Sequence, residues 1–236
     1  MNPVAIFRHF HTEGPGYFAT FLERHGIPWQ LVRIDAGDPV PAAADAFSGL
    51  VFMGGPMSVN DDLPWIAPVL ALIRDAVAGG VPVLGHCLGG QLMAKALGGT
   101  VSRNPVREIG WGEVTVADGA QAQRWFGHAA PAFGSFHWHG ETFTIPPGAE
   151  HLLSSAHCAN QAFALGPHLG LQCHVEMTPE MIASWCESGA REIARSSDSP
   201  GVQPVAAIKT DLEPRLRMLH AVADGVYARW IENLKR

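Results

Sequence analysis

The chain has 236 residues, 47% of them hydrophobic, and a formal net charge of -6. This length and apolar content are sufficient for the core of a compact domain, and we expect one domain over residues 1–236. A pI near 6.0, with 16 Lys and Arg against 22 Asp and Glu, gives no electrostatic reason to expect nucleic acid or an anionic membrane as a partner.

The start of the chain lacks a basic leader followed by a long apolar stretch, and no segment reaches the roughly 18 uninterrupted apolar residues of a membrane span. We therefore expect a cytoplasmic protein. The cysteines lack CxxC spacing and the density of a disulfide-stapled secreted domain. Reduced thiols are accordingly expected at Cys87, Cys158, Cys173 and Cys186.

In the first half of the chain, short β-rich runs alternate with longer segments whose apolar spacing suits helices. The runs are 4–7, 30–34, 49–53 and 81–84, and the helical segments include 17–25 and 64–78. Strands separated by helices imply right-handed βαβ crossovers and a mostly parallel sheet covered on both faces. The sequence therefore predicts a doubly wound α/β fold in which ligands bind beyond the carboxyl ends of the strands.

After residue 99 the pattern changes to short runs separated by Gly, Pro and polar turns, at 113–116, 142–145, 152–155, 162–165 and 169–173. It predicts a small antiparallel β ribbon followed by a return to the sheet. Thr178 precedes Pro179 and an early acid, an order typical of a helix N-terminus, so a helix is expected from there to Cys186. A surface loop at 196–204 and a final helix near 213–234 complete the prediction.

The most informative segment surrounds Cys87. A buried-type strand leads into Gly85-His86-Cys87-Leu88-Gly89 and then directly into an apolar-periodic helix. This is the strand, tight turn and helix context of the nucleophile in Gly-x-Ser-x-Gly hydrolases, with sulfur in place of oxygen. The glycines let the chain reverse closely, while the helix N-terminus favours a thiolate and offers backbone N–H groups to an oxyanion. Taken alone, this pattern leaves open an ordinary buried cysteine in a tight connection.

A second segment, 170–176, is a β-type run that ends in His174-Val175-Glu176. Alternation along a strand places positions i and i+2 on the same side, so Glu176 can orient the imidazole of His174 while the ring faces a nucleophile from elsewhere in the chain. A single His-x-Glu is more often a surface pair. Combined with the cysteine turn, it indicates a triad of Cys87, His174 and Glu176.

Three segments in this order resemble class I (triad-type) glutamine amidotransferases, particularly stand-alone members related to the glutaminase domain of GMP synthetase. The segments are 53–59 (MGGPMSV), 85–91 (GHCLGGQ) and 172–176 (QCHVE). The resemblance covers most of the chain through Glu176. It is in keeping with a flavodoxin-like sheet that has its active site at the carboxyl edge.

The resemblance implies roles for individual residues. Cys87 would be the nucleophile, His174 the general base and then acid, and Glu176 the orienting carboxylate. The backbone N–H groups of Gly55 and Leu88 would form the oxyanion hole.

For substrate binding, the resemblance implies that Gln91 helps to hold the amino acid end of the substrate. The stretch 137–143 matches a loop on the substrate side, which makes His139, Gly140 and Glu141 further binding candidates. His137, His139 and Glu141 also have the spacing of metal ligands on a strand, but the cysteines are scattered and no HExxH is present. We therefore expect no metal ion and no organic cofactor.

Two positions depart from the family pattern. Val175 stands where the family usually has proline; valine keeps an extended backbone without a fixed φ, so the geometry of the triad should survive. Cys173 stands where the family often has an aromatic residue, and the smaller side chain is expected to widen the pocket.

The expected reaction is cleavage of the γ-amide of glutamine through a γ-glutamyl thioester. Two alternatives remain: a γ-glutamyl peptidase that releases an amino acid or peptide, and a catalytically silent regulatory domain of the same fold. The segment after Glu176 is too short for an ATP-dependent acceptor module. An amidotransferase would therefore need a separate synthase protein as its partner.

Overall fold

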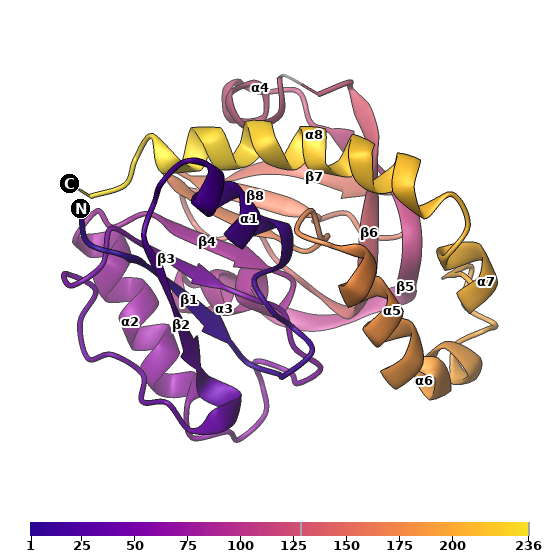
Figure 1. Cartoon of the computed structure of the whole chain (residues 1–236), viewed down its shortest axis with the longest axis horizontal. Coiled ribbons are helices and arrows are strands. Elements are labelled where there is room, and N and C mark those ends of the chain that lie inside the picture. Colours follow the sequence, from indigo (N-terminus) through magenta and orange to yellow (C-terminus); the bar gives the residue numbers. More distant parts are fainter. Residues whose placement is uncertain (128, 236) are drawn as a thin grey trace.

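The computed structural model describes residues 1–127 and 129–235, and a mixed ten-stranded sheet lies at the centre of this part of the chain (Figure 1). The strands are β1 (Val4–Arg8), β2 (Trp29–Arg33), β3 (Gly49–Phe52), β4 (Val83–His86), β5 (Val101–Val116), β6 (Ala132–Phe143), β7 (Glu150–Ser155), β8 (Ala162–Leu165), β9 (His168–Leu171) and β10 (Gly201–Val202). Their order is β10-β5-β7-β8-β9-β4-β3-β1-β2, with β6 paired to β5.

The sheet has a parallel and an antiparallel part. Strands β2, β1, β3, β4 and β9 pair in parallel, as the alternation of runs and helices predicted. Strands β9, β8, β7, β5 and β6 pair in antiparallel fashion, and β10 adds a short parallel pairing to β5. The predicted doubly wound fold with an antiparallel ribbon is confirmed. The ribbon continues the same sheet, and the predicted runs 113–116 and 142–145 fall at the ends of the much longer β5 and β6.

Helices cover both faces of the sheet. They are α1 (Gly16–Arg24), α2 (Ile66–Ala78), α3 (Leu88–Ala96), α4 (Ala120–Phe126), α5 (Pro179–Ser188), α6 (Ala190–Arg195), α7 (Val205–Ile208) and α8 (Leu212–Ile231), with a 3-10 turn η1 (Ile34–Ala36) after β2. The predicted start of α5 is confirmed, because the side chain of Thr178 accepts a hydrogen bond from the backbone N–H of Met181. Among the described helices, none combines the length and hydropathy needed to cross a bilayer.

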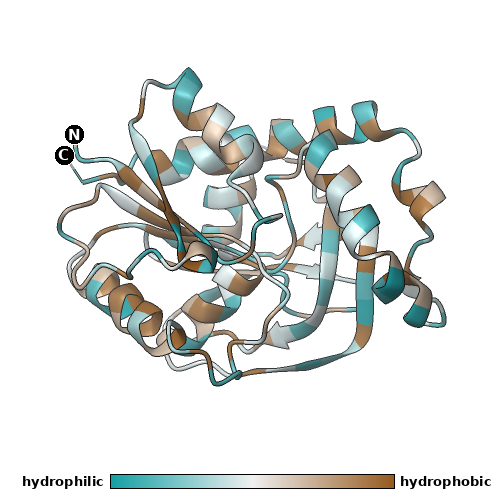
Figure 2. Ribbon diagram, turned by 60° about the horizontal axis from the view of Figure 1, so that its bottom comes forward, coloured by the Kyte–Doolittle hydropathy of each residue, from teal (hydrophilic) through white to brown (hydrophobic). Residues whose placement is uncertain are grey.

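Alternation along the strands produces two hydrophobic layers. In β1, Val4 and Ile6 pack into the layer shared with α1 and α8, whereas Ala5 and Phe7 face the layer shared with α2 and α3. All four side chains are fully buried. Figure 2 shows the hydrophobic residues concentrated along these central strands. A sheet buried on both faces leaves its edges and strand ends as the places for a polar site.

The two ends of the chain lie side by side (Figure 1). Ser48, just before β3, donates its backbone N–H to the carbonyl of Pro3 at 3.1 Å and accepts from the N–H of Lys235 at 2.9 Å. Both termini are therefore at the amino ends of the parallel strands.

Candidate active site

Cys87 occupies the turn between β4 and α3, at the carboxyl end of the parallel strands. Its φ of 51° and ψ of −106° lie in a region that L-amino acids rarely adopt. The backbone N–H of Cys87 donates to the carbonyl of Leu171 at 2.8 Å, and its carbonyl accepts from the N–H of Gln91 at 3.0 Å. Strand β9 and the first turn of α3 thus hold the thiol in place.

Three glycines make this sharp turn possible. A Cβ on Gly89 would overlap the carbonyl of Phe52, and one on Gly90 would overlap the carbonyl of Leu171. A Cβ on Gly85 would overlap the backbone of Gly89. Because every one of these obstacles is backbone, none can move aside as a flexible side chain would, and only glycine fits.

His174 and Glu176 are in direct contact. Nδ1–H of His174 donates to Oε1 of Glu176 at 2.6 Å, and both side chains are fully buried or nearly so. Their same-side arrangement agrees with the alternation argument, but β9 ends at Leu171, and His174 makes only an isolated antiparallel bridge to Phe136. The pair therefore lies on an extended segment beyond the strand, with the ring of His174 edge-on against Trp185 at a centroid distance of 4.9 Å.

The two groups favour each other's charged forms. Burial lowers the pKa of His174, but the Glu176 carboxylate and the nearby Cys87 side chain outweigh it, so the pKa is well above its usual value. Burial raises the pKa of Glu176, and the neighbouring His86 and His174 together bring it below its usual range. Nε2 of His174 has no hydrogen-bond partner among the described residues, which leaves this nitrogen available to a thiol or a substrate.

Gly55 lies directly against the start of α3. It belongs to the loop that follows β3, and a Cβ at this position would come within 2.8 Å of Leu88 Cδ2 and 2.6 Å of Met57 Sδ. The two residues predicted to form an oxyanion hole are thus neighbours, one on each side of the Cys87 turn.

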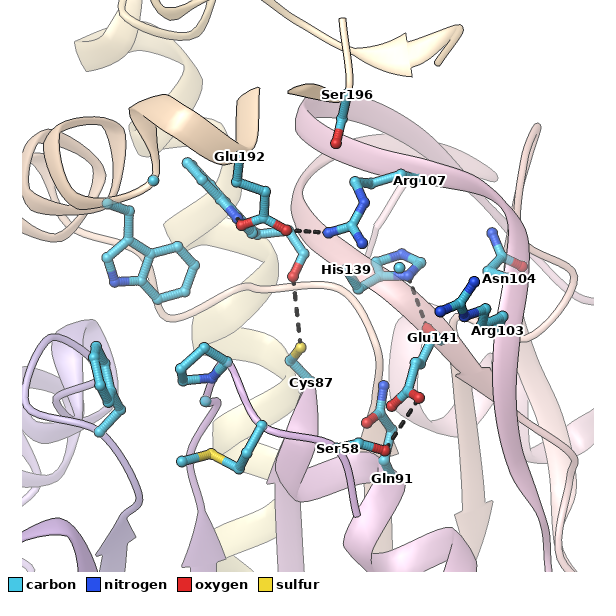
Figure 3. Close-up of a pocket in the computed structure, with 18 of the residues that line it drawn as sticks. Ser58, Cys87, Gln91, Arg103, Asn104, Arg107, His139, Glu141, Glu192 and Ser196 are labelled. Atoms are coloured by element: carbon cyan, nitrogen blue, oxygen red, sulfur yellow. Dashed lines mark hydrogen bonds and ion pairs between the residues drawn. The ribbon is translucent and has the colours of Figure 1, made fainter. Parts of the chain in front are cut away.

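An open cleft of about 940 Å³ brings most of the predicted site residues together (Figure 3). Of the nine, seven line it: Gly55, Cys87, Gln91, His139, Gly140, Glu141 and His174. The other two do not line the cleft: Leu88 packs against Gly55, and Glu176 is hydrogen-bonded to His174. Cys173 is fully buried and does not line the cleft, so the expectation that it widens the pocket is wrong.

Gln91 is connected to the thiol through a second amide. Its Nε2 donates to Oε1 of Gln172 at 3.0 Å, and Nε2 of Gln172 lies 3.5 Å from Sγ of Cys87. On the opposite side, the carbonyl of Trp138 lies 3.8 Å from the same sulfur. Strand β6 therefore forms one wall of the cleft through its backbone.

Several cleft residues were not predicted from the sequence, and Glu13 is the most notable. It lies in the β1–α1 loop, and a Cβ on Gly54 would be 2.7 Å from its Oε2 and 3.4 Å from Cε1 of His174. Burial raises the pKa of Glu13 to about 8. A polar residue just beyond the carboxyl end of the first strand was the available signal, because ligands collect at that edge.

Trp185 also lines the cleft, as do Arg103, Arg107 and Glu192. Arg107 forms an ion pair with Glu192, whose other oxygen accepts from the indole N–H of Trp138 at 2.9 Å. Through Glu192, these two interactions join α6 to β5 and β6 at the cleft.

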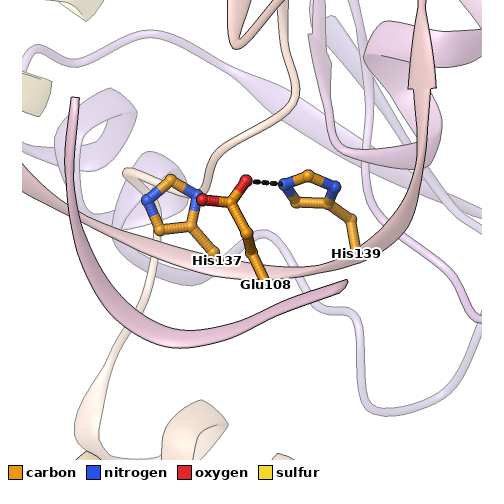
Figure 4. A group of neighbouring side chains, drawn as sticks. All are labelled: Glu108, His137 and His139. Carbon is orange, nitrogen blue, oxygen red and sulfur yellow. Dashed lines mark ion pairs between the residues drawn. The ribbon is translucent and has the colours of Figure 1, made fainter. Parts of the chain in front are cut away.

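His139 belongs to a second polar cluster with Glu108 and His137 (Figure 4). The potential ligand atoms of these three residues lie within 4.8 Å of one another. The side-chain nitrogen of Gln161 lies among them, donating to Glu108 at 2.8 Å and within 3.4 Å of a ring nitrogen of each histidine. The amide occupies the space between the three groups, and the arrangement is a buried hydrogen-bond network. The expectation of no metal ion stays a prediction.

Comparison with known proteins connects this arrangement to one family. The sequence profile described as "Glutamine amidotransferase class-I" matches residues 19–184. A crystal structure of a glutamine amidotransferase from Methylobacillus flagellatus superposes with a TM-score of 0.96 at 48% identity, over 100% of this chain and 96% of that one.

Curated relatives point the same way. A glutamine amidotransferase-like protein of Salmonella typhimurium, YfeJ, is 29% identical over 85% of this chain and 87% of its own length. Gamma-glutamyl peptidase 3 of Arabidopsis thaliana is 29% identical over 71% of both chains. A shorter match at 32% identity links 56% of the chain to 26% of the glutamine-hydrolysing GMP synthase of Aromatoleum aromaticum. The chain belongs to the class I glutamine amidotransferase family.

Proposed function

We propose that residues 1–236 form a single domain that hydrolyses the γ-amide of glutamine through Cys87, His174 and Glu176. The observation that carries the proposal is the position of His174. Glu176 holds its Nδ1 at 2.6 Å, and its Nε2 has no hydrogen-bond partner among the described residues. The Glu176 carboxylate and then the Cys87 side chain raise the pKa of this imidazole against the effect of burial. An imidazole held in this way can accept the thiol proton and later return it.

The reaction begins when the Cys87 sulfur forms a bond to the γ-carbonyl carbon and negative charge moves to the carbonyl oxygen. The backbone N–H groups of Gly55 and Leu88 stabilise this oxyanion. As the C–N bond breaks, His174 gives its proton to the leaving amine. Water, deprotonated by His174, then cleaves the γ-glutamyl thioester, and the thiol is restored.

Glu176 stabilises the imidazolium form of His174 in both steps. Its burial at 0% exposure keeps water from weakening this interaction. A catalytically silent domain of the same fold is the least supported function, because the thiol, the imidazole and the carboxylate are all present.

A γ-glutamyl peptidase is a second candidate, and the size of the cleft favours it. A volume of about 940 Å³ lies near the upper end of the roughly 300–1,000 Å³ typical of small-ligand sites. The similarity to Gamma-glutamyl peptidase 3 supports the same candidate. An amidotransferase passes ammonia to a synthase, and we expect a synthase partner to close the open cleft.

The test compares ammonia release from glutamine with amino acid release from γ-glutamyl dipeptides, using the purified chain. Cys87→Ser should abolish both, whereas Cys158→Ser and Cys186→Ser should leave them nearly unchanged, because neither cysteine lines the cleft. Wild-type activity in Cys87→Ser would overturn the proposal. A much higher kcat/KM for dipeptides than for glutamine would select the peptidase instead.

A further inference from the structure

The part of the cleft wall formed by β5 and β6 carries two oppositely charged side chains, Arg103 and Glu141, that form no ion pair with each other. Arg103 on β5 and Glu141 on β6 are directly opposite in the antiparallel register, and both line the cleft. Directly opposed residues project to the same face with Cβ atoms about 4.5–5.5 Å apart. Figure 3 shows both side chains on the same side of Cys87 as Gln91 and Ser58.

The two charged groups differ in their partners. Oε1 of Glu141 accepts a hydrogen bond from Oγ of Ser58 at 3.1 Å. Arg103 is exposed, and within residues 1–127 and 129–235 no hydrogen bond or ion pair involves its guanidinium. A cation with no partner among the described residues therefore lies across the strand pair from a carboxylate that Ser58 holds in place.

Gln91 adds a third polar group on this side. Because its Nε2 donates to Gln172, its amide oxygen is left as an acceptor facing the cleft. The α-amino acid end of glutamine carries an ammonium and a carboxylate on the same carbon. The carboxylate of Glu141 and the oxygen of Gln91 suit the ammonium, and the planar guanidinium of Arg103 suits the carboxylate in a two-pronged contact.

We propose that Arg103 binds the α-carboxylate of the γ-glutamyl donor and makes the cleft selective for donors in which this carboxylate is free. The inference rests on the proposed function, because it assumes that the γ-amide of the donor binds at Cys87. Free glutamine and γ-glutamyl compounds meet the requirement. Glutamine within a peptide chain does not, because its α-carboxyl group is part of an amide.

The test uses two donors with the same γ-amide, L-glutamine and its α-carboxamide, L-glutaminamide. Formation of the γ-hydrolysed product is measured by chromatography for the wild type, Arg103→Gln, Arg103→Lys and Arg195→Gln. Arg195 lines the same cleft from α6 and, in the described part of the chain, also lacks an ion pair, so it controls for loss of one positive charge.

The wild type should prefer glutamine, and Arg103→Gln should lower kcat/KM for glutamine about 10- to 100-fold, mainly through KM, with little change for glutaminamide. Arg103→Lys should restore part of the preference, and Arg195→Gln should keep all of it. An equal loss for both donors, or no loss for either, would overturn the inference.

Binding separates this inference from the proposed function. Calorimetry on Cys87→Ala, with and without Arg103→Gln, measures recognition without turnover. A preference for glutamine over glutaminamide that disappears with Arg103→Gln supports the inference even if the wild type proves inactive. Binding without that preference, or no binding at all, refutes the role of Arg103. If the wild type still turns over glutamine in that case, the proposed role of Cys87 is unaffected.

Discussion

The strained backbone at Cys87 predicts an unusual response to glycine. At a φ of 51° and ψ of −106°, any side chain with a Cβ is held in a conformation that costs about 1–3 kcal/mol. Glycine adopts it freely. We therefore compare Cys87→Ala with Cys87→Gly, since both lack the sulfur and differ only in the methyl group.

Two effects common to any buried alanine-to-glycine change lower stability and oppose the relief of strain by glycine. Its greater freedom in the unfolded chain costs about 0.5–1 kcal/mol, and losing one buried methyl costs about 0.8 kcal/mol. Relief of strain should cancel these terms, so that Cys87→Gly is about as stable as Cys87→Ala or up to about 1.5 kcal/mol more stable. Ala94, fully buried in the adjoining helix α3, is the control; Ala94→Gly should lose about 1.5 kcal/mol.

Urea unfolding followed by circular dichroism provides the measurement, with midpoints compared at unchanged slope. The change in the free energy of unfolding from alanine to glycine is measured at positions 87 and 94. The difference between these two changes is the strain energy at position 87, which should be about 2 kcal/mol. If glycine is as costly at position 87 as at position 94, the backbone at Cys87 is not strained.

Three other predictions concern the turn, the triad and the cleft. Gly89→Ala should lose more than about 3 kcal/mol or fail to fold, because its Cβ would overlap backbone, whereas Gly14→Ala, with open space around it, should stay within about 0.5 kcal/mol in the same urea assay. Glu176→Gln should lower kcat about 10- to 10⁴-fold in steady-state assays while His174→Ala falls to background, and full activity in Glu176→Gln would remove the carboxylate from the mechanism. Glu13 has a folded pKa of about 8 against an ordinary 4.5, so the native state holds this proton more tightly and its contribution to stability falls as pH rises between these values. Glu13→Gln should therefore gain about 1–3 kcal/mol relative to the wild type between pH 5 and pH 9, and a constant difference across that range would show that Glu13 ionises normally.

The nucleophile turn could be predicted because its signal is local. Gly85, Cys87 and Gly89 are close in sequence, and the obstacles that require glycine are neighbouring backbone: the start of α3 for Gly85 and the end of β3 for Gly89. The contact between His174 and Glu176 was also predicted from spacing, although β9 ends three residues before His174. An extended segment preserves the two-residue alternation without a continuous strand.

Glu13 and Arg103 could not be predicted as site residues, for different reasons. Glu13 lies near His174 because the β1–α1 loop brings its carboxylate next to Gly54, and loop paths depend on tertiary packing. Arg103 lies on β5, whose first half contains Pro105 and a break in register between Arg103 and Glu108. Such a segment resembles a loop in sequence, and its partner strand comes some thirty residues later in the chain.

The neighbouring chain ends lie at the amino ends of the parallel strands, whereas the thiol lies at the carboxyl ends of the same strands. A tag, a surface anchor or a fused protein at either end can therefore be attached without obstructing the cleft. A short linker could also join the two ends, so that new termini could be opened in an exposed loop on that same side, such as the one between α1 and β2. Such a permuted chain would keep the order of strands around Cys87 and still present the cleft to a partner protein.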